Sequence, residues 1–139
     1  MKYTYRFKPR FSDFDQYGIV HHSVYYKYLE EARIEAFEYY FNGSLESFLE
    51  DEYYVLVMDM SIKFLQRIDK RDYHKVFLDI DMRNGTYVLC SFSIQDDSEK
   101  VVYTKGTIKL CFVSKNYELM SSYPEKIKRY IEEHKIYFD

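Results

Sequence analysis

The 139-residue sequence contains no tryptophan, two cysteines, two prolines and four glycines. No repeat, low-complexity tract or linker rich in glycine, serine or proline interrupts it. Hydrophobic residues make up 47% and charged residues 31% of the chain, a balance typical of a globular protein and not of a disordered one. We therefore expect a single domain over residues 1–139.

The sequence also lacks long apolar runs and an excess of basic residues. Its longest apolar run, Tyr53 to Met58, is too short to span a membrane, and no apolar segment of signal-peptide type follows Met1. A net charge of −3 argues against a nucleic-acid partner. Cys90 and Cys111 fall in strand-like segments, where we expect buried free thiols, so the sequence predicts a cytoplasmic protein.

Motifs for cofactors and metals are missing as well. There is no glycine-rich phosphate loop, no nucleophile elbow around Ser23 and no Glu-x-x-His pattern. His21 and His22 would point apart at the start of a helix, and no Cys or His lies at a suitable spacing to complete a zinc site with them. We therefore expect neither a cofactor nor a metal.

Aromatic residues are abundant instead: 17 Tyr and 11 Phe give 20% of the chain, which favours strands and large apolar contacts. Apolar and polar residues alternate in five segments that predict strands, namely 2–8, 54–64, 76–82, 88–94 and 102–112. Asn84-Gly85 predicts a two-residue hairpin loop, and residues 96–98 predict another turn. We expect the last four segments to follow one another in hairpin succession and therefore to form an antiparallel sheet.

A long amphipathic helix is predicted between the first two strands, from about Ser23 to Tyr40. Its larger apolar side chains recur at the spacing of one buried face: Tyr25, Tyr28, Leu29, Ala32, Ala36 and Tyr40. Ser23 is the predicted N-cap, and Asn42-Gly43 the predicted C-terminal stop.

Two shorter helical segments complete the prediction. Leu45, Phe48 and Leu49 indicate a short helical turn, and residues 122–125 open a C-terminal helix with an apolar stripe that includes Ile127. A single long helix covers only one face of the sheet. We therefore expect the protein to oligomerise.

The connection from Phe11 to His22 leads into the long helix and carries two carboxylates, Asp13 and Asp15. A helix N-terminus offers free N–H groups and a partial positive charge, and Asp15 lies just upstream of it. We interpret Asp15 as a functional carboxylate; the alternative is that it only caps a turn or the helix start. Asp13 is interpreted as structural or solvated.

The run Arg10-Phe-Ser-Asp-Phe-Asp15-Gln-Tyr-Gly18-Ile-Val-His-His22-Ser-Val-Tyr25, followed by Tyr28-Leu-Glu-Glu-Ala-Arg33, resembles the acyl-CoA thioesterases of the 4-hydroxybenzoyl-CoA thioesterase family. It looks most similar to the subgroup of the Tol-Pal-associated thioesterase. The resemblance implies an α+β hot-dog fold, in which an antiparallel sheet of about five strands wraps around one long central helix and a short C-terminal helix follows. It also implies a homodimer or homotetramer that pairs its sheets around the active sites.

Carried over residue by residue, the resemblance implies that Asp15 and His22 are catalytic. Asp15 would act as a general base or as a nucleophile, and the backbone N–H near His22 would polarise the thioester carbonyl. The His22 side chain matches a histidine that the subgroup carries in its active site. The residues expected to bind the substrate are Gly18, Val20, Tyr25 and Arg67. Many relatives carry a proline where this chain has residues 66–68.

The expected reaction is hydrolysis of an acyl-CoA to the free acid and CoA. The phosphates of CoA need nearby cations, and the candidates are Lys63, Arg67, Lys70, Arg71, Lys105 and Lys109. Three alternatives remain open: a thioesterase acting on acyl-carrier-protein substrates, a hot-dog hydratase or dehydratase, and a non-catalytic module that binds acyl thioesters. Tyr17 and Val20 stand where the hydratase motif needs other residues, which counts against that alternative.

Overall fold

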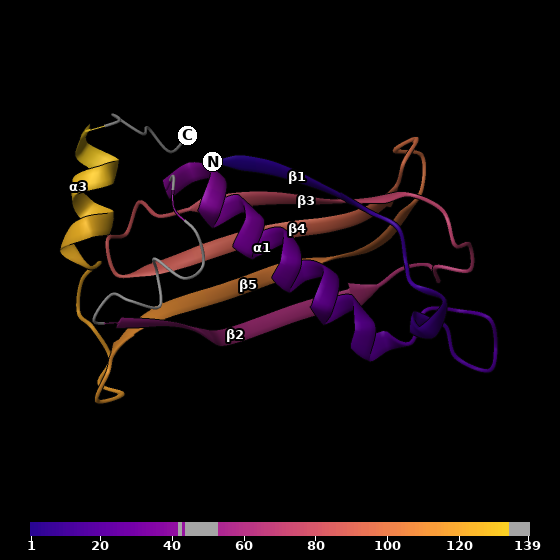
Figure 1. Cartoon of the computed structure of the whole chain (residues 1–139), viewed down its shortest axis with the longest axis horizontal. Helices are drawn as coiled ribbons and strands as arrows, with labels where there is room; N and C mark the ends of the chain where they lie inside the picture. The colour runs from indigo at the N-terminus through magenta and orange to yellow at the C-terminus, as the bar shows by residue number, and fades with distance from the viewer. Residues whose placement is uncertain (42, 44–52, 134–139) are drawn as a thin grey trace.

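The fold is a curved antiparallel sheet with one long helix on its inner face, seen here in a computed structural model that describes residues 1–41, 43 and 53–133. Figure 1 shows the elements in chain order: strand β1 (Lys2–Phe7), helix α1 (Tyr25–Phe41), strands β2 (Tyr53–Phe64), β3 (His74–Asp81), β4 (Tyr87–Asp96) and β5 (Val102–Ser114), and helix α3 (Glu125–Glu133). Two short 3₁₀ turns, η1 (Phe11–Asp13) and η2 (His22–Val24), lie between β1 and α1.

The five strands form one sheet in the order β1-β3-β4-β5-β2, and all neighbours are antiparallel. Because β1 pairs with β3, helix α1 and strand β2 are inserted between two strands that lie side by side in space. The α+β architecture predicted from the alternating segments is confirmed.

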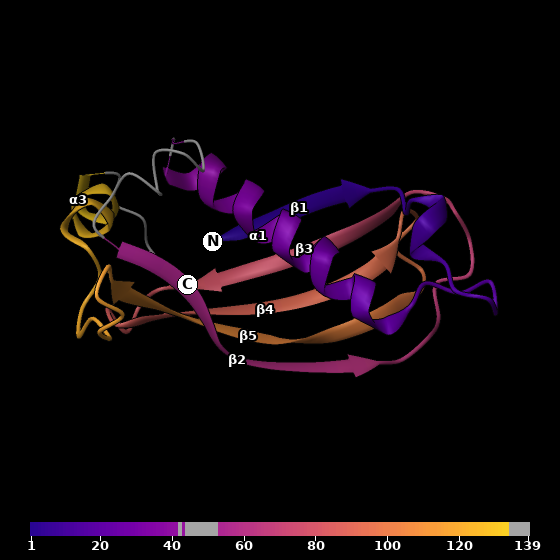
Figure 2. The same cartoon turned by 60° about the horizontal axis from the view of Figure 1, so that its bottom comes forward.

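Helix α1 crosses the inner face of the sheet obliquely, and the sheet curves around it (Figures 1 and 2). The buried residues of α1 are Tyr25, Tyr28, Leu29, Ala32, Ala36 and Phe41, which agrees with the predicted face up to Ala36. They pack on apolar side chains that alternate along the strands, as the period of two predicts. Those of β3 and β4 are Val76, Leu78, Ile80, Val88, Cys90, Phe92 and Ile94.

Both cysteines are free and buried, as predicted. The phenyl and phenol rings mostly serve the core, where Phe7 stacks on Tyr28 with 4.2 Å between ring centroids. No helix of the described residues is long and apolar enough to span a membrane. The predicted stop at Asn42, the helical turn at Leu45 to Leu49 and His134 lie outside the described residues.

Three predicted details of the strands are wrong. The hairpin succession of the last four strands fails for β2, which pairs with β5 and not with β3, because β1 occupies the other edge of β3. Met58 does not continue the inner face of β2, because the pairing of β2 with β5 shifts between Val57 and Asp59. A bulge of this kind turns the side chains on either side out of register, and Met58 is exposed. The loop after β3 is also longer than two residues, because the Asn84 side-chain oxygen accepts the N–H groups of Thr86 and Tyr87 and thus delays the start of β4.

Candidate active site

The segment from Phe14 to Val20 folds back on itself as a small hairpin-like loop that carries Asp15. Phe14 and Val20 form an isolated antiparallel bridge, and the Asp15 N–H donates to the Ile19 carbonyl at 2.9 Å. The Asp15 carbonyl accepts the Gly18 N–H at 3.0 Å. Gly18 has a φ of 74°, in the left-handed region where a side chain would be strained, so this turn needs a glycine.

The helix begins one turn earlier than α1 itself, with the 3₁₀ turn η2. Its N-cap is His21 and not Ser23, because the His21 ring nitrogen Nδ1 accepts the Ser23 N–H at 3.3 Å. The predicted Ser23 cap is therefore wrong, although the Ser23 hydroxyl does contact the same nitrogen at 2.8 Å. Among the hydrogen bonds of the described residues, none uses the His22 N–H, which is free to meet a ligand.

The connection between β2 and β3 forms the opposite wall of this region. Ile68 is fully buried there; its carbonyl accepts the Val20 N–H at 2.9 Å and its N–H donates to the Tyr25 hydroxyl at 3.4 Å. The Tyr25 ring lies edge-on to the Phe64 ring, with centroids 5.2 Å apart. Two hydrogen bonds of the Ile68 backbone and one ring contact thus hold the end of β2 and the connection that follows it against the start of the helix.

A cavity of about 690 Å³ lies between these segments. Five of the six predicted site residues line it: Asp15, Val20, His22, Tyr25 and Arg67. Gly18 does not line the cavity; it lies in the turn behind Asp15. The cavity is open to solvent and begins at the N-terminus of the helix, where the sequence predicted a functional site.

Several lining residues were not predicted: Gln16, Tyr17, Ile19, His21, Phe64, Leu65 and Gln66. Phe64 could have been found, since it ends the predicted inner face of β2 on the side of the helix. Ile68 also carried a signal, because it is the one apolar residue in a run of charged residues from Arg67 to Asp72. An isoleucine in such a run is a candidate for burial, because isoleucine is among the residue types most often found fully buried.

The polar groups of the cavity differ in how many hydrogen bonds they already make within the protein. One oxygen of Asp15, Oδ1, accepts the Tyr17 N–H at 2.8 Å, and no described residue bonds to the other. Burial raises the pKa of the Tyr25 phenol, so the hydroxyl stays protonated near neutral pH. Since its oxygen already accepts the Ile68 N–H, its proton remains for donation to a ligand. The cavity therefore offers a carboxylate oxygen, a hydroxyl donor and backbone N–H groups.

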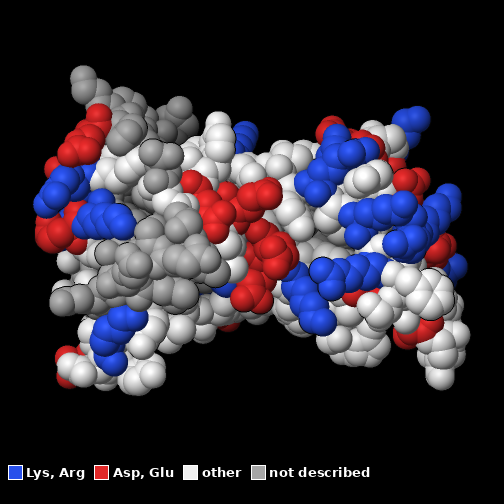
Figure 3. All heavy atoms as spheres, viewed as in Figure 1, with Lys and Arg blue, Asp and Glu red and all other residues white. Residues whose placement is uncertain are grey.

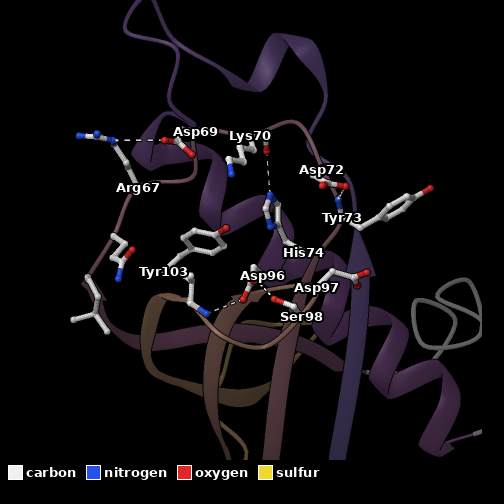
Figure 4. A pocket seen from close by; sticks show the side chains of 13 residues that line it. Arg67, Asp69, Lys70, Asp72, Tyr73, His74, Asp96, Asp97, Ser98 and Tyr103 are labelled. Carbon is white, nitrogen blue, oxygen red and sulfur yellow. Dashed lines mark hydrogen bonds and ion pairs between the residues drawn. The ribbon is translucent and has the colours of Figure 1, made fainter.

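A second cavity, of about 890 Å³, lies on the other side of residues 65–67 (Figure 4). His74 and Tyr103 line it, and the His74 ring donates from Nε2 to the Lys70 carbonyl at 3.1 Å. His74 is buried beside Phe7 and belongs to the packed interior. The carboxylates around this cavity outnumber the cations, which disfavours a phosphate ligand there: Asp69, Asp72, Asp96 and Asp97 against Arg67 and Lys70.

Charge is unevenly distributed over the face that carries α1. Figure 3 shows Lys and Arg side chains gathered over the end of the molecule where the helix begins, while Asp and Glu gather nearer the middle. The exposed basic residues on the segments that meet at that end include Lys8, Arg10, Lys27, Lys63 and Arg67. The first cavity thus opens in a region rich in cations.

A comparison with protein-family models finds one match, described as the thioesterase-like superfamily, over residues 9–131. The chain belongs to the thioesterase-like superfamily. The match includes every residue of the first cavity and of the loop that carries Asp15. No curated protein matches the sequence significantly.

Solved structures show that this superfamily member has the predicted hot-dog fold. The 1,4-dihydroxy-2-naphthoyl-CoA thioesterase Slr0204 from Synechocystis has a TM-score of 0.81 and 17% identity, over 99% of this chain and 100% of that one. A DHNA-CoA thioesterase from Staphylococcus aureus has a TM-score of 0.80 and 15% identity, over 96% and 86%. The S. aureus protein SAV2348, solved in complex with CoA, has a TM-score of 0.81 and 12% identity, over 96% of this chain and 84% of that one. The resemblance to the Tol-Pal-associated subgroup stays a prediction.

Proposed function

We propose that this protein hydrolyses acyl-CoA thioesters to the free acid and CoA. The observation that carries the proposal is that Asp15 and His22 line one cavity at the N-terminus of the long helix in a member of the thioesterase-like superfamily. A base or nucleophile and a group of N–H donors are the two requirements for cleaving a thioester.

Asp15 supplies the first requirement by one of two routes. As a general base, its free oxygen takes a proton from water while the water oxygen bonds to the acyl carbon; the carbon–sulfur bond then breaks and the thiolate takes up the proton. As a nucleophile, the carboxylate oxygen itself bonds to the acyl carbon and expels the thiolate. Water then hydrolyses the resulting anhydride to the free acid and the Asp15 carboxylate, and the proton released goes to the thiolate. Both routes give one acid and one thiol.

The start of the helix supplies the second requirement. The unengaged His22 N–H would donate to the carbonyl oxygen as negative charge develops on it, and the partial positive charge of the helix N-terminus adds to this effect. A single such donor contributes about 10²–10³ in rate. The His22 side chain lies beside the His21 ring, with centroids 4.2 Å apart, and borders the same space.

The remaining walls match the two parts of an acyl-CoA. Ile19, Val20, Phe64 and Leu65 give the cavity an apolar side on which an acyl group can pack. Arg67 is the cation in its wall, and further Lys and Arg side chains surround this end of the molecule, where they can bind phosphates. SAV2348, which shares the fold, was solved in complex with CoA.

A thiol-release assay over acyl-CoAs of graded chain length and aromaticity tests the proposal. We expect turnover of at least one substrate, with competition by free CoA. Acyl-carrier-protein thioesters in the same assay distinguish the two kinds of thiol. Binding of acyl-CoAs without any release of thiol would contradict the proposal and favour the non-catalytic binding module, and enoyl-CoA hydration would favour a hydratase.

A further inference from the structure

Asp13 is a buried carboxylate that the proposed reaction does not use. Its side chain is 9% exposed, and its Oδ2 accepts the Tyr28 hydroxyl at 2.7 Å and the Arg10 N–H at 2.8 Å. A buried carboxylate without donors is strongly destabilising, so these two bonds fix where Asp13 lies. Its backbone carbonyl also accepts the N–H of His21, the N-cap of the helix, at 3.1 Å.

Tyr28 is held as firmly as its partner. Its ring stacks on Phe7 with centroids 4.2 Å apart and an interplanar angle of 26°, and it lies edge-on to Tyr25 at 6.4 Å. Burial and the negatively charged Asp13 raise the pKa of the Tyr28 phenol well above its usual range. The hydroxyl therefore remains a donor near neutral pH.

These contacts connect the loop of Asp15 to the helix. Residues 14–20 form a closed unit through the Phe14–Val20 bridge and the bonds from Asp15 to Ile19 and Gly18. Asp13 lies at the base of this loop, directly before Phe14. Tyr28 is the fourth residue of α1 and thus ties the base to the helix whose N-terminal turn carries the free His22 N–H.

We propose that Tyr28, acting through Asp13, is a positioning residue that fixes the Asp15 carboxylate relative to the N-terminus of the helix. This inference rests on the proposed thioesterase function. Neither side chain lines the cavity, so neither touches the substrate. Removing the Tyr28 hydroxyl leaves Asp15 and the helix intact but removes the side-chain bond between the base of the loop and α1.

The variant Tyr28→Phe tests this, because it keeps the ring that stacks on Phe7 and removes only the hydroxyl. Tyr123→Phe is its matched control: the Tyr123 hydroxyl is also buried and donates to the carbonyls of Met82 and Tyr87, at the other end of the sheet. Both variants lose a buried hydrogen-bonding group, so a general loss of stability affects them alike.

We expect Tyr28→Phe to lower kcat for thioester hydrolysis by about 10- to 100-fold, because small displacements of a reacting group have effects of this size. KM should stay within about threefold, and Tyr123→Phe should stay within about twofold of wild type in kcat, as expected for a site remote from the reaction. A kcat for Tyr28→Phe within twofold of wild type, or an equal loss in both variants, would overturn the inference.

Amide hydrogen exchange separates this inference from the proposed function. In Tyr28→Phe we expect the amides of Asp15, Gly18 and His21 to exchange at least about tenfold faster than in wild type, and in Tyr123→Phe to be unchanged. If the wild type cleaves no thioester, the proposed function fails, but amide hydrogen exchange still tests the positioning role. Unchanged exchange of these three amides in Tyr28→Phe would refute it.

Discussion

Asp13 and Asp15 are separated by one residue, yet their carboxylates lie in opposite environments. Asp13 is buried and accepts two hydrogen bonds, whereas Asp15 is half-buried, lines a cavity and has one oxygen without a partner among the described residues. The sequence predicts a functional role for Asp15 from its position before the helix and from its motif. The bond from Tyr28 to Asp13 could not be predicted, because it depends on how α1 packs over the loop.

Buried phenols are a second feature at the scale of single residues. Burial raises the pKa of Tyr123 above its usual range, as burial and Asp13 do for Tyr28. At the surface, partial burial and the hydrogen bond to Glu35 raise the pKa of Tyr3 to about 12. In the unfolded chain these phenols lose their protons near pH 10, while in the folded chain they keep them. Unfolding therefore releases protons above pH 10.

This gives a prediction for alkaline solution. The stability contributed by Tyr28 and Tyr123 is fully present below about pH 10 and is lost as the pH rises above it. We expect the urea midpoint to fall from pH 10 upward, and absorbance at 295 nm to show that part of the 17 tyrosines ionise only on unfolding. Tyr28→Phe and Tyr123→Phe should each reduce the fall. Ionisation of all tyrosines near pH 10 in the folded protein would contradict this.

At the scale of elements, the pairing of β5 with β2 depends on a residue without a side chain. Gly106 pairs with Ile62 across the two strands. A Cβ atom at this position would overlap the Ser61 carbonyl oxygen and lie 2.9 Å from the Phe92 ring. Because the obstacle is the backbone of the neighbouring strand, it cannot move aside without disturbing the ladder.

Gly106→Ala should therefore destabilise the protein by more than about 3 kcal/mol, at the upper end of the range for overpacked cores. Gly85→Ala is the control: Gly85 has a φ of 77° but nothing within 4 Å of an added Cβ, so only backbone strain opposes it. We expect a loss of about 1–2 kcal/mol there. Urea denaturation measures the free energy of unfolding of both variants. Equal losses would show that the close approach at Gly106 does not add to the destabilisation.

The elements also show which parts of the fold a sequence reveals. Alternation and helical spacing are properties of local residues, and they predicted all five strands and the buried face of α1. The bulge at Met58 and the cap at His21 were not predicted. A bulge is decided by the register against β5, and a histidine caps a helix only when its ring nitrogen happens to face the first N–H groups.

For the whole molecule, the position of α1 leaves the β2 edge of the sheet less covered than the β1 edge. Helix α1 packs on β1 and β3, whereas β2 forms the opposite edge (Figure 2). Three consecutive apolar residues are exposed on that edge: Leu56 at 44%, Val57 at 47% and Met58 at 52%. Exposed apolar edge strands favour association with another chain. The homodimer or homotetramer predicted from the sequence stays a prediction, and this edge supports it.

Light scattering after size exclusion tests that prediction. We expect a dimer or tetramer at micromolar concentrations, and a shift toward monomer in the double variant Val57→Lys, Met58→Lys, since two charges on the edge oppose association. Thr4→Lys, on the exposed face of β1 at the other edge, should leave the assembly unchanged. A monomeric wild type would refute the expectation of an oligomer.

The site itself is a property of the whole molecule, since it joins the connection before α1 to the end of β2 and the connection that follows. The motif predicted half of the lining residues on the first of these segments. Arg67 on the second was predicted as well. Phe64 and the buried Ile68 were not predicted; the sequence held a signal for their burial, but their contacts with Tyr25 and Val20 depend on how the two segments pack in the folded chain.

The most direct test of this account is the turnover of Asp15→Asn on the best thioester substrate of the wild type. The amide oxygen of asparagine can still accept the Tyr17 N–H, so the loop should remain folded. Asp81→Asn is the matched control, because Asp81 likewise accepts an N–H two residues on, from Arg83, at 3.0 Å and far from the cavity. We predict a loss of about 10²–10⁴ in kcat for Asp15→Asn and none for Asp81→Asn; full activity in Asp15→Asn would contradict the account.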